Sequence, residues 1–278
     1  MQGEFPDDDY AWAPLSIACA YGYLRTVEAL LAGDADPNAV CYHKSDTILW
    51  YPTVYSPNVE CVRAMLRYGA DPNQSQLDPP LLVDMMIFNR NDSAPLIPIC
   101  DSLLHGTCPI NLNATNNDGQ TALMVASGFN NIDMVNWLLK YGADTDVLDR
   151  FNNSALWYAS YKGNVGIATS LLNKRAKIDV AHAAGRDPLL FGADFALYNS
   201  SGDAFMMEVS KSRQIEVTKM LIEKGADINR KGTNGETPIF LAIGHHHNNA
   251  LTRLLAENGA KMDGMVRNTS TPSTWFGH

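Results

Sequence analysis

Apolar residues in this chain come in pairs that are followed by a short polar turn, and this arrangement recurs seven times. It is clearest over residues 138–146, where two leucines precede Lys-Tyr-Gly-Ala-Asp-Thr-Asp. Copies start at residues 30, 65, 103, 138, 171, 221 and 255, so most spacings are 33 to 38 residues and one is 50. A period near 33 residues is typical of small stacked units and not of one globular core. The recurrence therefore predicts a stacked array and favours binding over chemistry as the function.

Each unit is predicted to contain two short helices and a projecting loop. In the fourth unit Leu123 and Ala126 share one helical face, and Met134 and Leu138 share a face of the following helix. Thr121 precedes the first of these helices and can cap its start with its hydroxyl, as Thr237 can in the seventh unit. Pro14 and Pro238 fit the first turn of a helix. Glycines that allow a left-handed helix end follow four of the second helices: Gly69, Gly142, Gly225 and Gly259. One unit cannot bury its own apolar faces, so neighbouring units must stack.

Three unit openings carry a further motif: Ala-Pro-Leu-Ser-Ile-Ala at 13–18, Ser-Ala-Leu-Trp-Tyr-Ala at 154–159 and Thr-Pro-Ile-Phe-Leu-Ala at 237–242. Together with the Gly-Ala-Asp phrases they resemble the ankyrin repeat, which opens Thr-Pro-Leu-His-x-Ala. The resemblance implies an all-α ankyrin-repeat solenoid of about seven helix-turn-helix units with hairpin loops. It also implies that the chain is a scaffold that binds a protein partner through its concave face and hairpin loops.

Departures from the repeat predict local differences in structure. Asp34, Thr107 and Arg175 replace the stop glycine, so these helix ends should be looser or strained. Pro52 falls inside the first helix of the second unit and should kink or shorten it. The position of the family's histidine holds four other residues, so apolar packing should replace the polar contacts made there: Ser16, Met124, Trp157 and Phe240.

The repeat predicts the domain boundaries and two insertions. Residues 1–12 form an acidic N-terminal arm, residues 13–263 the ankyrin repeat domain, and residues 264–278 either a C-terminal tail or a truncated eighth repeat. About seven extra residues around 89–95 should lie between the helices of the third unit. A longer apolar insertion near 181–198 should lie in the hairpin before the sixth unit. In the alternative register, a helix starts at Asp187-Pro188-Leu189 and the extra residues lie between the two helices of that unit.

Composition limits the classes of function. The net charge of −9 argues against a nucleic-acid partner, which needs clustered Lys and Arg, and no apolar run is long enough to span a membrane. The five cysteines are an odd number without paired spacing, which fits a reducing, cytoplasmic compartment. His245-His246-His247 are interpreted as loop residues and Cys100, His105 and Cys108 as core or loop residues, not as metal ligands. We expect no cofactor and no enzymatic activity, and a monomer.

Specificity in a solenoid resides in positions that the repeat does not dictate. Aromatic side chains and arginine are the usual anchors of interfaces, and the ends of the first helices and the hairpin tips carry several. The predicted partner-binding residues are Tyr21, Tyr42, Tyr55, Asp118, Phe129, Arg150, Phe151, Tyr161, Asn234 and His245.

The resemblance also implies candidate hydroxylation sites, since an asparaginyl hydroxylase of eukaryotic cytosol modifies hairpin asparagines that have a leucine eight residues upstream. Asn38, Asn111 and Asn229 fit that spacing, although asparagine also suits such a turn for structural reasons. As an alternative function, the chain would be the substrate-targeting domain of a larger protein. A secreted effector of an intracellular bacterium, acting in the host cytosol with its catalytic domain outside this chain, is an example.

Overall fold

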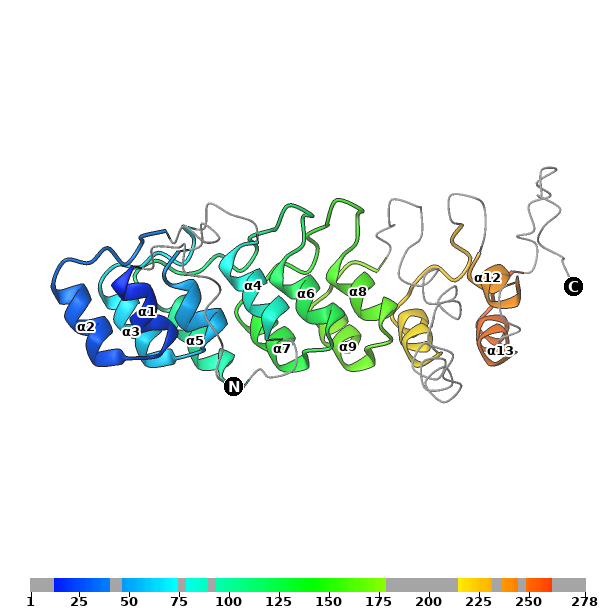
Figure 1. The fold of residues 1–278 in the computed structure, drawn as a ribbon. Helices are drawn as coiled ribbons and strands as arrows, with labels where there is room; N and C mark the ends of the chain where they lie inside the picture. Colours follow the sequence, from blue (N-terminus) through cyan, green and yellow to red (C-terminus); the bar gives the residue numbers. More distant parts are fainter. Residues whose placement is uncertain are drawn as a thin grey trace, which may run out of the picture. The chain divides into compact units, whose positions relative to one another are not determined.

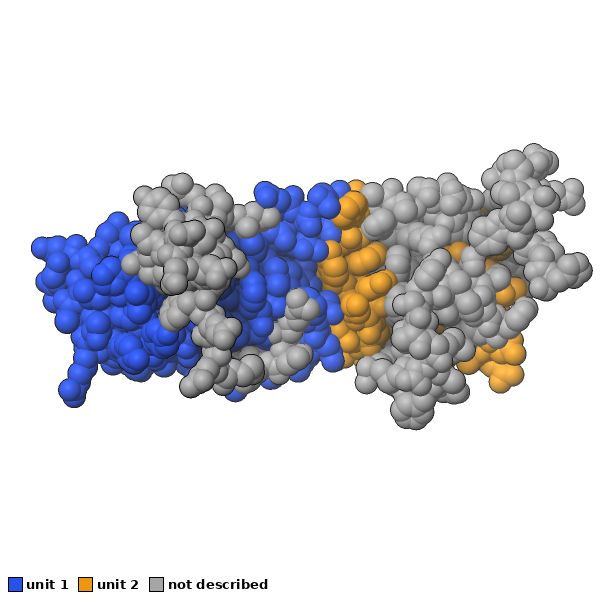
Figure 2. Space-filling model, in the orientation of Figure 1, with its two compact units in different colours: residues 1–150 blue, residues 151–278 orange. Residues whose placement is uncertain are grey.

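The computed structural model describes residues 13–40, 47–74, 79–89, 94–178, 215–231, 237–244 and 249–261. The chain divides into two compact units, residues 1–150 (unit 1) and residues 151–278 (unit 2) (Figure 2). Each unit is built from paired helices (Figure 1). Within the described residues there is no strand, only isolated bridges that join Val40 to Thr47 and Thr115 to Thr121. The predicted all-α fold is confirmed.

Unit 1 consists of helix pairs that stack in two layers (Figure 1). The first helices, α1, η1, α4 and α6, pack against one another in succession, and so do the second helices α2, α3 and α5. Each hairpin segment joins a second helix to the next first helix, and the hairpins project from one edge of the helices in Figure 1. The bounds are α1 (Pro14–Ala20), α2 (Leu24–Ala32), η1 (Tyr51–Tyr55), α3 (Val59–Arg67), α4 (Leu81–Phe88), α5 (Leu96–Leu104), α6 (Ala122–Gly128) and α7 (Ile132–Lys140).

Unit 2 repeats the same pairing. It contains α8 (Ala155–Tyr161), α9 (Val165–Asn173), α12 (Pro238–Gly244) and α13 (Asn249–Glu257), and residues 215–223 are also helical. Ile239, Leu241, Ala242, Leu251 and Leu255 form a buried cluster between α12 and α13. The predicted insertion near residues 181–198 lies outside the described residues, so both of its registers stay predictions.

Local chemistry explains where the helices begin and end. The hydroxyl of Thr121 accepts a hydrogen bond from the Met124 amide at 3.3 Å, which caps the start of α6 as predicted. Pro14 stands at the start of α1, where a missing amide hydrogen costs nothing. The four predicted stop glycines all have φ between +88° and +93°, a region that glycine enters without steric cost.

Two of the three residues that replace a stop glycine are strained. Asp34 has φ +64° and Arg175 has φ +66°, which places a Cβ atom in the left-handed region. Thr107 is not in that region, because the chain leaves α5 by a different turn. Of the two predicted alternatives, a looser or a strained helix end, strain is confirmed at Asp34 and Arg175; Thr107 is not strained, and a looser end there stays a prediction.

The second and third repeats depart from the regular unit where expected. Tyr51–Tyr55 form a short π-helix in place of a regular first helix, because Pro52 lacks an amide hydrogen. The hydroxyl of Thr53 compensates by donating to the carbonyls of Leu49 at 2.8 Å and Trp50 at 3.0 Å. Residues 89–95 lie between α4 and α5, which confirms the extra residues of the third repeat.

The four positions of the family's histidine behave differently from one another. Met124 and Trp157 are buried, as apolar packing requires, and the buried Ser16 hydroxyl donates to the Ala13 carbonyl at 2.7 Å. Phe240 is 41% exposed, so the prediction of apolar packing was wrong at this position. Its side chain faces solvent from the first turn of α12.

Candidate partner-binding surface

The ends of the first helices of unit 1 carry large exposed aromatic side chains. Tyr21 follows α1, Tyr55 ends η1 and Phe129 follows α6, and they are 50%, 59% and 40% exposed. These three were predicted as contact residues on the basis of their equivalent positions. Their exposure shows that the inter-repeat core does not require them.

Further aromatic residues gather near Tyr55 and form what we call the aromatic cluster, Trp50, Tyr51, Tyr55 and Phe88. The Trp50 ring centroid lies 6.4 Å from Tyr55 and 6.0 Å from Phe88, and the Phe88 contact is edge-to-face. Trp50 and Tyr51 also meet edge-to-face at 5.4 Å. Phe88 is 56% exposed although it closes α4, whose preceding residues 81–86 are buried.

The buried side chain of Asp84 forms a hydrogen bond with this cluster. The indole Nε1 of Trp50 donates to Oδ2 of Asp84 at 2.6 Å, and Asp84 is almost fully buried. This hydrogen bond fixes the orientation of the Trp50 ring. Sequence reasoning missed Trp50 and Phe88 because the irregular openings of the second and third repeats hid their positions. The only signal was the aromatic end of the apolar run 81–88.

Tyr21 also has a neighbour that the sequence analysis did not select. Its ring stacks on Tyr23 with centroids 5.5 Å apart and planes 14° apart. Tyr23 precedes α2 and is itself exposed. The pair therefore presents a flat aromatic surface at the turn between α1 and α2.

In unit 2 the predicted contact residue Tyr161 is less available than the aromatic residues of unit 1. It is half-buried, and its ring stacks on Trp157 of the same helix, with centroids 5.3 Å apart and planes 7° apart. The ammonium of Lys162 lies 5.0 Å from the Tyr161 centroid, within cation–π range. Part of the Tyr161 side chain thus covers its own helix.

Two predicted contact residues at hairpin tips are paired with each other. Arg150 Nη1 lies 2.6 Å from Asp118 Oδ1, and the Arg150 amide donates to the Asp118 carbonyl at 2.9 Å. Gly119 permits this approach, since a Cβ atom there would come within 3.0 Å of Asp149 Cα. Phe151 follows Arg150 and is 45% exposed. The predicted residues Tyr42, Asn234 and His245 lie outside the described residues.

Among the described residues, the hairpin asparagines Asn38, Asn73, Asn113 and Asn229 each form a hydrogen bond with the following repeat. Asn38 donates through Nδ2 to the Gly69 carbonyl at 2.9 Å and accepts through Oδ1 from the Asp71 amide at 2.7 Å. Asn229 makes the same pair of bonds to the Gly259 carbonyl and the Lys261 amide. Both candidate hydroxylation sites therefore have structural roles, and their modification stays a prediction.

Asn111 is placed differently from the other two candidates. Its Oδ1 accepts from the Asn113 amide at 2.9 Å, which is the role of Asp36 and Asp71 in their hairpins. Asn113 accepts from the amide of Asp144 in the next hairpin and so takes the role of Asn38. The linking asparagine lies eight residues after Leu30 in the first repeat and ten residues after Leu103 here, so the leucine eight residues upstream of Asn111 stands in a different structural relation to it.

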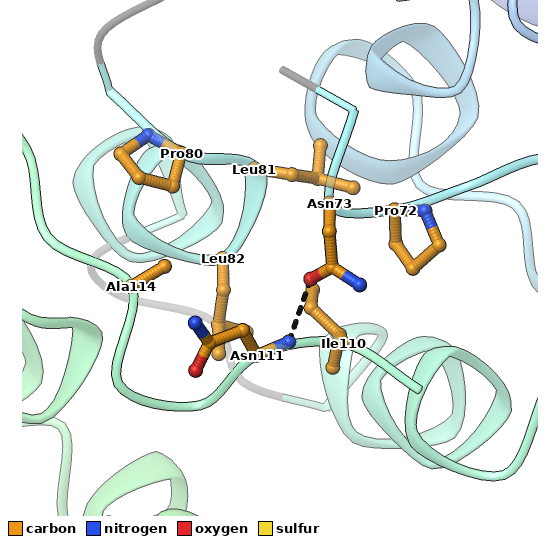
Figure 3. A pocket seen from close by; sticks show the side chains of 8 residues that line it. All are labelled: Pro72, Asn73, Pro80, Leu81, Leu82, Ile110, Asn111 and Ala114. Carbon is orange, nitrogen blue, oxygen red and sulfur yellow. Dashed lines mark hydrogen bonds between the residues drawn. The ribbon is translucent and has the colours of Figure 1, made fainter. Parts of the chain in front are cut away.

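A small pocket opens where the hairpins of the second and third repeats meet the start of α4 (Figure 3). Its volume is about 220 Å³, below the roughly 300–1,000 Å³ of ordinary small-molecule sites. In Figure 3 the Asn73 carboxamide oxygen accepts from the Asn111 amide at 2.7 Å across its wall. It is lined by Pro72, Asn73, Pro80, Leu81, Leu82, Ile110, Asn111 and Ala114. Such a pocket suits one apolar side chain of a partner.

The cysteines of the described residues are thiols in structural positions. Cys100 is fully buried, and burial raises the pKa of its thiol. Cys108 donates to Asp71 Oδ1 at 3.1 Å, and this hydrogen bond raises the pKa of the Cys108 thiol. Among the residues with described positions, no group of His, Cys, Asp and Glu side chains is arranged to hold a metal ion, and none of the helices is long and apolar enough to cross a membrane.

Comparisons with known proteins point to one family. The family model "Ankyrin repeats (3 copies)" matches residues 90–182 and 187–269, and the model "Ankyrin repeat" matches residues 12–42. The ankyrin repeat domain of Bcl-3, a solved structure, covers 89% of this chain with a TM-score of 0.71 and 22% identity, and all of that chain is covered. This likeness shows the fold.

Curated relatives match a smaller part of this chain and are longer than it. An ankyrin repeat-containing protein of Treponema pallidum is 29% identical over 47% of this chain and 38% of its own length. An ankyrin repeat protein of fowlpox virus is 29% identical over 55% of this chain and 33% of its own length. The chicken nuclear factor NF-kappa-B p105 subunit is 27% identical over 58% of this chain and 15% of its own length. The chain thus spans well under half the length of these relatives.

Proposed function

Because the chain belongs to the ankyrin repeat family, whose domains are generally protein-binding scaffolds, we propose that it binds a protein partner through the first-helix ends and hairpins. The observation that carries this proposal is the exposure of Tyr21, Tyr55 and Phe129 at equivalent positions of the first, second and fourth repeats. Exposed aromatic residues cost solubility, and aromatic side chains anchor interfaces more often than most.

The hairpin tips contribute the polar part of the proposed interface. Asp118 and Arg150 present opposite charges on partly exposed side chains, and Phe151 stands next to them. Since their ion pair is surface-exposed, it contributes little to stability and can exchange partners at small cost. The small pocket beside Asn73 would receive an apolar side chain of the partner.

The test begins with affinity capture from a cell lysate and identification of the partner by mass spectrometry. Binding of that partner is then measured for the double variant Phe129→Ala plus Tyr161→Ala. We expect a loss of about 2 kcal/mol or more, which is the range of interface hot spots. The melting temperature should fall less than it would for a core residue, because Phe129 is exposed and Tyr161 is only half-buried.

Tyr68→Ala is the matched control. Tyr68 is 45% exposed but follows α3, a second helix, so its loss should leave partner binding unchanged. A double variant that binds normally and melts much earlier would assign these aromatic residues to the stack and the partner to another surface. Equal loss of binding in Tyr68→Ala would show that the effect is not specific to the first-helix ends.

A second candidate is that the chain is the substrate-targeting segment of a larger protein, such as a secreted effector. It is favoured by the short span of this chain within its relatives, 38% in the Treponema pallidum protein and 15% in the p105 subunit. In that case the same surface would hold a substrate for a catalytic domain elsewhere. A partner that is covalently modified in cells only when the intact gene product is present would distinguish this candidate from a simple scaffold.

A further inference from the structure

The last described helix pair, α12 and α13 (Figure 1), leaves two large apolar side chains exposed. Phe240 and Ile243 lie three residues apart on α12, so they share a helical face, and they are 41% and 42% exposed. The equivalent residues of three other repeats are at most 8% exposed at the position of Phe240 and fully buried at that of Ile243. The exposure is therefore a property of the seventh repeat and not of these positions. The equivalents are Ser16, Met124 and Trp157 for the first position, and Cys19, Ser127 and Ser160 for the second.

In earlier repeats the repeat that follows covers this face. The thiol of Cys19, which has the place of Ile243 in the first repeat, lies 3.9 Å from the Met65 sulfur of the second repeat. On the second helices, Leu66 lies against the third repeat, since a Cβ atom added to Gly106 would be 3.6 Å from its side chain. The seventh repeat carries an exposed alanine, residue 256, at the position of Leu66. The exposed face of α12 and α13 is thus the one on which a following repeat packs.

Other side chains of α12 are already packed against the preceding repeat. Ile239, Leu241 and Ala242 belong to the buried cluster between α12 and α13, and Ile215 and Ile222 of the preceding second helix pack against this cluster. The two exposed side chains lie outside that contact. They are consequently open to a further apolar partner.

The chain leaves α13 along the path that leads to another repeat elsewhere. Gly259 has φ +90°, as the other stop glycines do, and the Asn229 side chain bonds to its carbonyl and to the Lys261 amide. Further along the sequence, Thr271-Pro272 follows Thr237-Pro238 by 34 residues, which is one period of the repeat. The hairpin and this spacing favour the chain's own C-terminal residues as the occupant of the exposed face.

We propose that residues 264–278 cover Phe240 and Ile243 as the first helix of an eighth repeat. Ser273 stands where other openings carry leucine or isoleucine, so Trp275 and Phe276 supply the apolar surface of this segment. Burial of these side chains against one another removes apolar area from water. A tether of about ten residues gives the segment an effective concentration of roughly millimolar, which favours it over a second molecule. The inference does not depend on partner binding, and it makes this face part of the array's own core.

The test measures how fast a thiol introduced by Ile243→Cys reacts with iodoacetamide, followed by mass spectrometry of the peptide that contains it. Cysteine suits this position, because Cys19 has the equivalent place in the first repeat, and no natural cysteine follows Cys108. Adding Trp275→Ser plus Phe276→Ser keeps the chain length and should raise the reaction rate at least about tenfold, because the thiol loses its cover. Shortening the Ile243→Cys chain to residues 1–263 should raise the rate to the same level.

Arg253→Cys is the matched control. Arg253 is exposed on α13 at the position of Asn136, which stays exposed although the fifth repeat follows it. A thiol there should react equally fast in the 278-residue chain, the serine variant and the shortened chain. Circular dichroism of each variant verifies that the helices are intact.

Three results would overturn the proposal. The thiol of Ile243→Cys would react at the same rate with and without residues 264–278, or its protection would survive the two serine substitutions. Protection that disappears when the protein is diluted would assign the cover to a second copy of the chain. Protection that is independent of protein concentration and is lost in both the serine variant and the shortened chain supports the C-terminal segment.

Discussion

Replacing Asn73 with alanine should weaken the junction between the second and third repeats. The Asn73 side chain donates to the Pro109 carbonyl at 2.9 Å and accepts from the Asn111 amide at 2.7 Å. A neutral hydrogen bond contributes a net ~0.5–1.5 kcal/mol, and water can replace part of it at an exposed site, so we expect a loss of about 1–2 kcal/mol. Because neighbouring repeats contribute to stability through their shared interface, this loss should fall on the whole of unit 1.

Two assays measure the effect of Asn73→Ala. Thermal unfolding should show a melting temperature lower by about 2–8 °C, since 1 kcal/mol corresponds to roughly 2–4 °C in a domain of this size. Amide hydrogen exchange gives the local measurement, because the Asn111 amide loses its acceptor and should exchange about tenfold faster. Amides within α7 should keep their protection.

Gln74→Ala is the matched control, since Gln74 is an exposed neighbour in the same hairpin. It should change neither the melting temperature nor exchange at Asn111. An Asn73→Ala variant that melts like the unaltered chain, with Asn111 still protected, would refute the reasoning. The asparagine links would then be consequences of the stacking and not contributors to it.

Two further predictions concern strain and buried thiols. Arg175→Gly should raise the free energy of unfolding of unit 2 by about 0.5–1 kcal/mol, measured by urea unfolding. The reason is that glycine removes the steric strain of a left-handed residue, ~1–2 kcal/mol, and this gain exceeds the entropy that glycine adds to the unfolded chain. An unchanged or lower urea midpoint would contradict the prediction. Burial raises the pKa of the Cys61 and Cys100 thiols in the folded chain. As the pH rises, the unfolded chain therefore loses these protons at a lower pH than the folded chain does. The free energy of unfolding should fall as the pH rises above about 8.5. Denaturant titrations at neutral and alkaline pH measure this fall, which Cys100→Val should reduce, and a flat profile up to pH 10 would oppose the assignment.

Much of the fold could be predicted because neighbouring residues determine it. The hydroxyl of Thr121 caps α6, Pro52 interrupts the first helix of the second repeat, and Gly142 ends α7 in the left-handed region. Each of these effects depends on backbone atoms within a few residues. Because such signals recur from repeat to repeat, helix ends can be predicted from the sequence without knowledge of the packing.

The candidate surface could be predicted only in part. Tyr21, Tyr55 and Phe129 are exposed as their repeat positions suggested, whereas Tyr161 stacks on Trp157 and is half-buried. The position of a residue in the repeat indicates that its side chain lies at the end of a first helix. It does not indicate whether a neighbouring ring covers that side chain.

The sequence by itself determined the repeat, the helix pairs and the family, because period, caps and stop glycines act over short distances along the chain. Only the tertiary structure decided which side chains meet. Trp50 and Asp84 lie 34 residues apart and form one hydrogen bond, and two extra residues in the third repeat give Asn113, not Asn111, the linking role of Asn38. The physical reason is that these contacts depend on how one repeat is placed against the next, and that placement is set by the packed core as a whole.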